Sequence, residues 1–124
     1  MKYGFLRVAA ASPSLKVADP AYNAARISEV IEQQAKKGTE ILVFPELSLS
    51  GYTCGDLFLQ KTLTDGCMRA LMTVAEATKG KKMLVFVGLP LLCEGKLYNC
   101  AAGIANGKVE GIVPKTYLPN YNEF

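Results

Sequence analysis

The chain has 124 residues, of which 50% are apolar, 20% charged and 9% aromatic, a composition that fits one globular domain and excludes a disordered or collagen-like chain. Its net charge of +3, with no run of more than two basic residues, gives no reason to expect a nucleic acid partner. No apolar stretch approaches the roughly 20 residues that a membrane span needs, so we expect a cytoplasmic protein with no membrane partner.

Two absences narrow the possible chemistry. The sequence contains no histidine, so acid–base chemistry has to use Glu, Asp, Lys, Tyr or Cys, and no histidine-based dyad or metal site can form. The cysteines show no Cys-x-x-Cys spacing, and a cytoplasmic chain favours reduced thiols over disulfides or zinc ligands. We therefore expect no metal and no cofactor in this chain. The four cysteines are Cys54, Cys67, Cys93 and Cys100.

The start of the chain predicts a β-α-β unit. Residues 3–11 have the pattern of a strand. Asp19 and Pro20 mark the start of a helix, because Asp caps the first amide groups and Pro fits the first helical position. Gly38 marks the end of that helix. Residues 40–44 form a short apolar run, typical of a strand buried on both faces, and strands joined by a helix run parallel.

A second helix is predicted over residues 64–79 and a buried strand over 83–89, so the fold class is α/β. Beyond this strand, Glu94-Gly95 and Asn106-Gly107 are turn dipeptides between strand-like segments, and Asn-Gly is a strong hairpin signal. The predicted order is therefore β-α-β-α-β followed by hairpin strands. The apolar stripe of the second helix is expected to pack in the core rather than to bind a cofactor; it comprises Cys67, Met68, Leu71, Met72 and Ala75.

Two charged residues stand where predicted strands end. Glu46 follows the strand at 40–44, and Lys115 follows the strand-like residues 111–114. Ligands of α/β sheets gather beyond the carboxyl ends of the strands, where a carboxylate suits a general base and a lysine suits an oxyanion. On position alone, an exposed loop glutamate and a solvated lysine are the more frequent explanations, and both readings stay open.

Cys54 is the one cysteine within a predicted loop, at residues 51–56. A thiolate nucleophile at this place is conceivable, because a partly exposed thiol can be activated by its neighbours. A packed loop thiol is the more frequent case, so Cys54 stays a secondary candidate.

Two motifs resemble those of the nitrilase, or carbon–nitrogen hydrolase, superfamily. The first is Phe-Pro-Glu-Leu at residues 44–47 followed by Ser-Gly-Tyr at 50–52, and the second is Lys-Thr-Tyr-Leu-Pro at 115–119. The longer strings at 46–58 and 113–124 are similar to the amidotransferase domain of glutamine-dependent NAD⁺ synthetases. The resemblance spans essentially the whole chain.

The resemblance implies a nitrilase-like αββα sandwich of two sheets, of which this chain would form only the N-terminal half. Residues 1–124 would then be the N-terminal part of a glutaminase domain, with the synthetase domain absent. Half of such a sandwich leaves apolar strand faces uncovered, so association into a homo-oligomer, or aggregation, is expected.

The resemblance also implies a catalytic triad of Glu, Lys and Cys. Glu46 would be the general base, Lys115 would stabilise the oxyanion, Tyr121 would line the glutamine pocket and Tyr52 would pack near it. In the family the nucleophilic cysteine lies beyond the lysine motif, whereas all four cysteines of this chain precede Lys115. The chain on its own is therefore predicted to be inactive.

The implied reaction is hydrolysis of the glutamine side-chain amide through a γ-glutamyl thioester. The ammonia would serve ATP-dependent synthesis of NAD⁺ from nicotinic acid adenine dinucleotide in a parent enzyme, whose synthetase domain would bind ATP and Mg²⁺. Two alternatives stay open. One is a fragment of another nitrilase-type amidase, and the other is a non-catalytic binding or assembly module that keeps the β-α-β frame.

Overall fold

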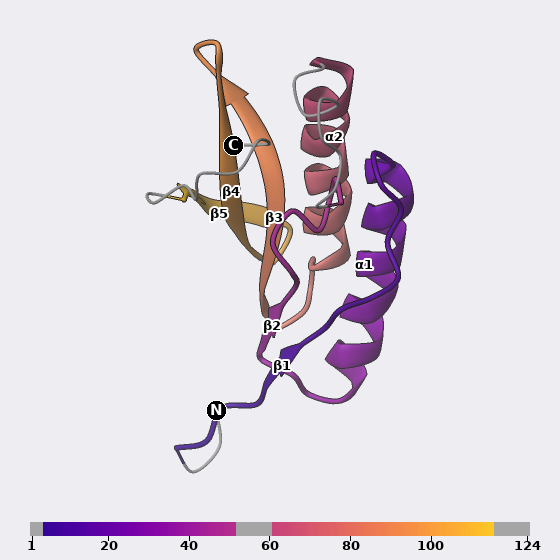
Figure 1. Cartoon of the computed structure of the whole chain (residues 1–124). Coiled ribbons are helices and arrows are strands. Elements are labelled where there is room, and N and C mark those ends of the chain that lie inside the picture. Colours follow the sequence, from indigo (N-terminus) through magenta and orange to yellow (C-terminus); the bar gives the residue numbers. More distant parts are fainter. Residues whose placement is uncertain (1–3, 52–60, 116–124) are drawn as a thin grey trace.

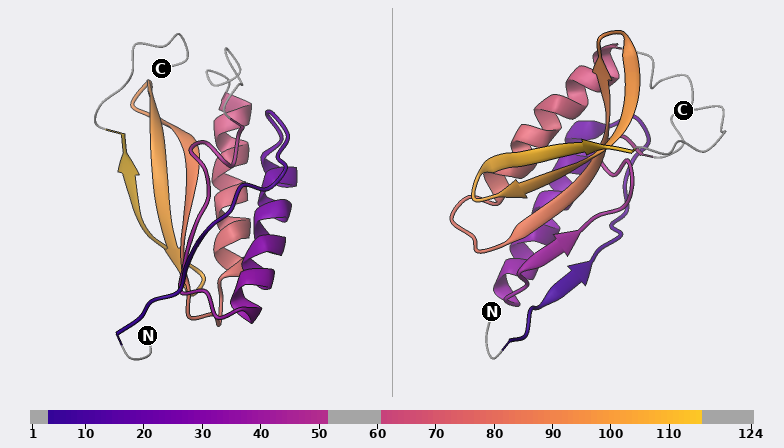
Figure 2. Two further views of the ribbon diagram at one scale, coloured as in Figure 1. Left: turned by 60° about the horizontal axis from the view of Figure 1, so that its bottom comes forward. Right: turned by 90° about the vertical axis from the view of Figure 1, so that its left-hand side faces the viewer.

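The computed structural model describes residues 4–51 and 61–115, which form one five-stranded sheet with two helices on one of its faces (Figure 1). In Figure 2 the two helices lie side by side on that face, and no helix or strand of the described residues covers the other. The elements are β1 (Val8–Ala10), α1 (Pro20–Lys36), β2 (Ile41–Val43), α2 (Lys61–Ala77), β3 (Leu84–Cys93), β4 (Lys96–Ala105) and β5 (Lys108–Pro114).

The strand order in the sheet, β1-β2-β3-β4-β5, is the same as the order along the chain. Strands β1, β2 and β3 run parallel, with α1 and α2 as the connections between them. Strands β4 and β5 follow as antiparallel hairpin partners. The predicted order of elements, β-α-β-α-β followed by hairpin strands, is thus confirmed.

Three strands differ in length from the prediction. β2 covers Ile41–Val43 instead of residues 40–44, and pairing explains the other two differences. β1 covers only Val8–Ala10, because its partner β2 offers three residues to pair with. β3 extends past the predicted end at residue 89 and includes Pro90, because β4 pairs with it over ten residues. The lengths of β1 and β3 therefore match the number of residues that the neighbouring strand pairs with, rather than the length of their own apolar segments.

Helix α1 begins and ends where the sequence indicates. The Asp19 carboxylate accepts a hydrogen bond of 3.1 Å from the backbone N–H three residues further on, which satisfies one of the free amides of the first turn. Gly38 follows the helix with φ +78°, a conformation that glycine adopts without a steric cost. Ile27 and Ile31 are fully buried, so this face anchors α1 in the core.

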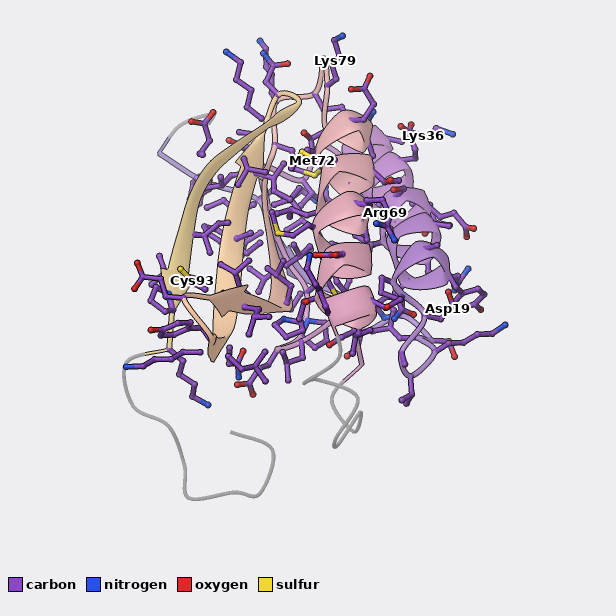
Figure 3. All side chains as sticks on the ribbon, turned by 90° about the horizontal axis from the view of Figure 1, so that it is seen from above. Asp19, Lys36, Arg69, Met72, Lys79 and Cys93 are labelled. Atoms are coloured by element: carbon purple, nitrogen blue, oxygen red, sulfur yellow. The ribbon has the colours of Figure 1, made fainter. Side chains whose placement is uncertain are left out.

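Helix α2 begins three residues earlier than predicted, and part of its predicted buried face is wrong. Cys67, Leu71 and Ala75 are buried as expected, but Met68 is 36% exposed and Met72, labelled in Figure 3, is 52% exposed. Each methionine lies one residue past a buried position, about 100° further around the helix, which turns it out of the stripe. The other buried apolar residues of α2 are Leu63, Ala70 and Val74.

Alternation along the strands gives the sheet one buried and one open face. Val85, Val87 and Leu89 of β3 lie on the buried face, in the core between the sheet and the helices. The other face, here called the open face, is also apolar, yet Val43 and Val113 on it are 42% and 65% exposed. By strand register it comprises Val8, Ala10, Ile41, Val43, Leu84, Phe86, Ala101, Gly103 and Val113.

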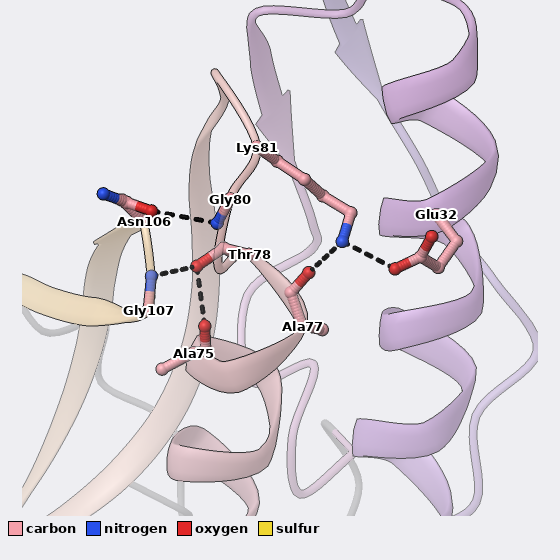
Figure 4. Close-up of polar contacts among 8 residues, drawn as sticks. All are labelled: Glu32, Ala75, Ala77, Thr78, Gly80, Lys81, Asn106 and Gly107. Atoms are coloured by element: carbon pink, nitrogen blue, oxygen red, sulfur yellow. Dashed lines mark hydrogen bonds and ion pairs between the residues drawn. The ribbon is translucent and has the colours of Figure 1, made fainter.

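The end of α2 is tied to the β4–β5 hairpin by hydrogen bonds (Figure 4). Thr78 Oγ1 donates to Ala75 O (2.7 Å) and accepts from Gly107 N (2.9 Å). Asn106 Oδ1 accepts from Gly80 N at 2.9 Å, so the predicted Asn-Gly turn exists and also holds the helix end. Thr78 is fully buried, which makes its two hydrogen bonds hard for water to replace.

The turn that follows β2, residues 46–50, packs directly on β3. Leu47 and Leu49 of this turn are fully buried. Leu49 N donates to Gly88 O (2.9 Å), and Ser48 Oγ accepts from Gly88 N (3.1 Å). A β-carbon on Gly88 would overlap the Leu47 amide nitrogen, so only glycine allows the turn to lie this close to the strand.

We expect Thr78→Val to lower the free energy of unfolding by about 1–3 kcal/mol, because the Gly107 N–H loses its acceptor while the side-chain shape is kept. Urea denaturation followed by circular dichroism measures the change. Thr73→Val is the matched control, since Thr73 is an exposed helix residue with a hydroxyl hydrogen bond to Arg69 O. It is expected to stay within about 0.5 kcal/mol. Equal losses in the two variants would contradict the structural role of Thr78.

We expect Gly88→Ala to lower the free energy of unfolding by about 1–3 kcal/mol, because the turn at 46–50 has to move away from β3. The same denaturation experiment measures it. Gly111→Ala is the control on the same sheet, because a β-carbon there meets no atom within 4 Å. Its effect is expected to stay within about 0.5 kcal/mol. A Gly88→Ala variant as stable as Gly111→Ala would show that the contact is not tight.

Candidate active site

Glu46 and Lys115 meet at one end of the open face although they lie 69 residues apart in the sequence. Glu46 begins the turn after β2, and Lys115 directly follows β5. The Lys115 ammonium nitrogen Nζ lies 3.0 Å from Glu46 Oε1, and the two side chains are 38% and 40% exposed. The structure therefore brings together the two charged residues that the sequence singled out.

Backbone pairing carries Lys115 to this position. The β3–β4 and β4–β5 hairpins return the chain to the level of the Glu46 turn. The last rung of the β4–β5 ladder pairs Cys100 with Pro114, and Lys115 N then donates to Asn99 O at 2.8 Å. This hydrogen bond extends the ladder by one residue, so the backbone of Lys115 is fixed to β4.

Asn99 is a third member of the site that sequence reasoning missed. Its side chain is 7% exposed, and its Nδ2 donates a hydrogen bond to Glu46 Oε1. The same carboxylate oxygen thus accepts hydrogen bonds from both Asn99 and Lys115. One signal for it was present in the sequence, because Asn99 is the only amide or charged residue between Leu97 and Ala105 of β4.

The three polar residues border a small pocket of about 330 Å³ on the open face. Its wall is largely apolar, and the polar groups of Glu46, Lys115 and Asn99 converge on it from three different segments of the chain. An apolar pocket with a few convergent polar groups is the usual form of a small-molecule site. The apolar wall residues include Val43, Phe44, Phe86, Ala101 and Val113.

The described cysteines are poorly placed to act as nucleophiles in this pocket. Cys100 touches the pocket but is a core residue, 4% exposed. Its burial raises the pKa of the thiol, with a smaller contribution from Cys93, so the thiolate is disfavoured. Cys67 is buried in α2, and Cys93 (Figure 3) is exposed at the end of β3.

Three of the residues considered in the sequence lie outside the described residues. They are Cys54, the secondary candidate nucleophile, and Tyr52 and Tyr121, the two residues expected near the glutamine pocket. Their roles stay predictions.

The described part of the chain offers no cluster of three or more Cys, Asp or Glu side chains that would hold a metal ion. Across residues 4–51 and 61–115, neither helix has the length and apolar character required to cross a membrane.

Comparison with curated proteins finds glutamine-dependent NAD(+) synthetases. The enzyme of Mycobacterium tuberculosis is 40% identical over 123 residues, which is 99% of this chain and 18% of the relative. The enzyme of Aquifex aeolicus is 40% identical over 119 residues, which is 96% of this chain and 21% of the relative. The chain thus spans about a fifth of the length of the curated relatives that it matches.

Solved structures share the fold. A glutamine-dependent NAD(+) synthetase from Cytophaga hutchinsonii superimposes with a TM-score of 0.86 and 31% identity, over 93% of this chain and 20% of that one. An amidase from Nesterenkonia sp. superimposes with a TM-score of 0.76 over 95% of this chain and 45% of that one, and at 20% identity this match concerns the fold alone. The sheet with its two helices is therefore part of a nitrilase-like fold.

A family model described as carbon-nitrogen hydrolase matches residues 7–124. The match includes every described strand and both helices, as well as the Glu46 turn and Lys115. The chain belongs to the carbon–nitrogen hydrolase family.

Proposed function

We propose that this chain supplies the general base and the oxyanion-stabilising lysine of a glutaminase site. The observation that carries the proposal is the contact between Glu46 and Lys115, which face each other at 3.0 Å beside a small apolar pocket. The relatives support the choice of substrate, because the matched synthetases are glutamine-dependent.

In the proposed reaction, Glu46 takes the proton from a cysteine thiol, and the sulfur attacks the side-chain carbonyl carbon of glutamine. The Lys115 ammonium stabilises the negative oxygen of the tetrahedral intermediate. The carbon–nitrogen bond then breaks, the amine takes the proton from Glu46 and ammonia leaves. Water attacks the remaining thioester with Glu46 again as the base, which releases glutamate. This route accounts for acid–base chemistry in a chain without histidine.

The nucleophilic cysteine of this proposal comes from a part of the parent enzyme outside these 124 residues. Two observations support this. Among the described cysteines, Cys67 and Cys100 are buried core residues and Cys93 is exposed at the end of β3, and the chain spans about a fifth of its relatives. The parent enzyme would pass the ammonia to ATP-dependent synthesis of NAD⁺ in the cytoplasm, with ATP and Mg²⁺ bound by its synthetase domain.

Covering of the open face is the second part of this proposal. Exposed valines on three strands of that face favour contact with a further protein layer, supplied by the rest of the parent enzyme or by another copy of the chain.

We expect Glu46→Gln and Lys115→Met each to reduce ammonia release from glutamine by about 100-fold or more in the full-length product of the gene, because each removes a group that acts in the transition state. A coupled glutamate or ammonia assay measures the rates. Glu110→Gln and Lys108→Met are the matched controls, since both residues are exposed on β5. If the site variants kept the activity of their controls, the proposed roles would be wrong.

We expect the 124-residue chain alone to release no ammonia above the background, whereas the full-length gene product does. The same assay compares the two at equal molar concentration, with Cys54→Ala prepared in the short chain. Turnover by the short chain that disappears in Cys54→Ala would place the nucleophile at Cys54. An inactive full-length product would refute the glutaminase proposal itself.

A further inference from the structure

We propose that Asn99 is a positioning residue for Glu46, which holds one carboxylate oxygen so that the other is presented to the reacting thiol. The inference rests on the proposed function, and it adds a residue to the site that the charged pair alone does not include.

The hydrogen bonds of the Glu46 carboxylate are divided unequally between its two oxygens. Asn99 Nδ2 and Lys115 Nζ both donate to Oε1. Among the described residues, no hydrogen bond reaches Oε2. A general base needs one unoccupied oxygen within reach of the proton that it abstracts. The arrangement assigns the holding role to Oε1 and the proton-transfer role to Oε2.

Asn99 is better suited than Lys115 to fix the direction of the carboxylate. Asn99 is 7% exposed and belongs to β4, which pairs with a neighbour on each side. The Lys115 side chain is 38% exposed, and its ammonium group lies at the end of a long chain that can adopt many rotamers. The base has to lie within about 3 Å of the thiol to take its proton. A carboxylate that is free to rotate would therefore slow the reaction, since a misplacement of about 1 Å can lower the rate by about 100-fold.

The side chain and the backbone of Asn99 serve the site separately. Its carbonyl oxygen accepts from Lys115 N at 2.8 Å, and its side-chain amide donates to Glu46. A substitution at Asn99 therefore removes the link to Glu46 and leaves the backbone link to Lys115 in place. This separation makes the role of the amide testable on its own.

The test uses Asn99→Leu and Asn99→Asp in the full-length gene product, because both keep the approximate size of the side chain and neither can donate to Glu46 as a neutral amide does. We expect kcat for glutamine hydrolysis to fall by about 10- to 100-fold, while KM changes by less than about threefold. Thermal unfolding is measured on every variant, so that a loss of folded protein is recognised separately.

Asn106→Gly is the matched control. It deletes an amide that accepts from Gly80 N at the far end of the hairpin, and glycine tolerates the φ of +48° found there. We expect its kcat to equal that of the wild type. A kcat loss in the Asn99 variants no greater than in Asn106→Gly, or a change confined to KM, would overturn the positioning role. An inactive wild-type protein would instead refute the proposed function, and the role of Asn99 with it.

Discussion

The position of Glu46 depends on the close approach of the backbone at residues 46–50 to β3. Leu47 within this turn has φ +54°, a left-handed conformation that costs a side-chain-bearing residue roughly 1–2 kcal/mol. Full burial of Leu47 and Leu49 contributes about 1.5–3 kcal/mol each, which outweighs that strain. The absence of a side chain at Gly88 allows both leucines to reach the core. The buried leucines and the hydrogen bonds to Gly88 together fix the backbone from which the Glu46 side chain extends.

The ion pair that defines the site contributes little to the stability of the fold. Both side chains are more than a third exposed, and pairs of that kind are worth about 0–1 kcal/mol. Stability therefore does not explain why a glutamate and a lysine so distant in sequence end up in contact. The contact is set by the β-ladders, which bring a carboxylate and an ammonium side by side at a largely apolar pocket.

Much of the fold could be predicted because its signals are local. The Asp19 cap and the Asn106-Gly107 turn each act within a few residues, and each occurs where the sequence indicates. The orientation of α2 was predicted less well, because Cys67 and Met68 are both apolar and only tertiary packing decides which of them is buried. Asn99 escaped notice for a related reason, since its role depends on a partner 53 residues away along the chain.

The order of the strands has a consequence for the assembly of the site during synthesis. The ribosome adds about 5–20 residues per second, so the Glu46 turn emerges several seconds before Lys115. The turn can dock as soon as β3 is available, because its contacts are to Gly88. Lys115 is synthesised after all of these residues, and the pairing of β5 with β4 is what brings it to Glu46. The contacts of the Glu46 turn with Gly88 therefore need the chain only as far as β3, whereas the charge pair also needs β4 and β5 in register.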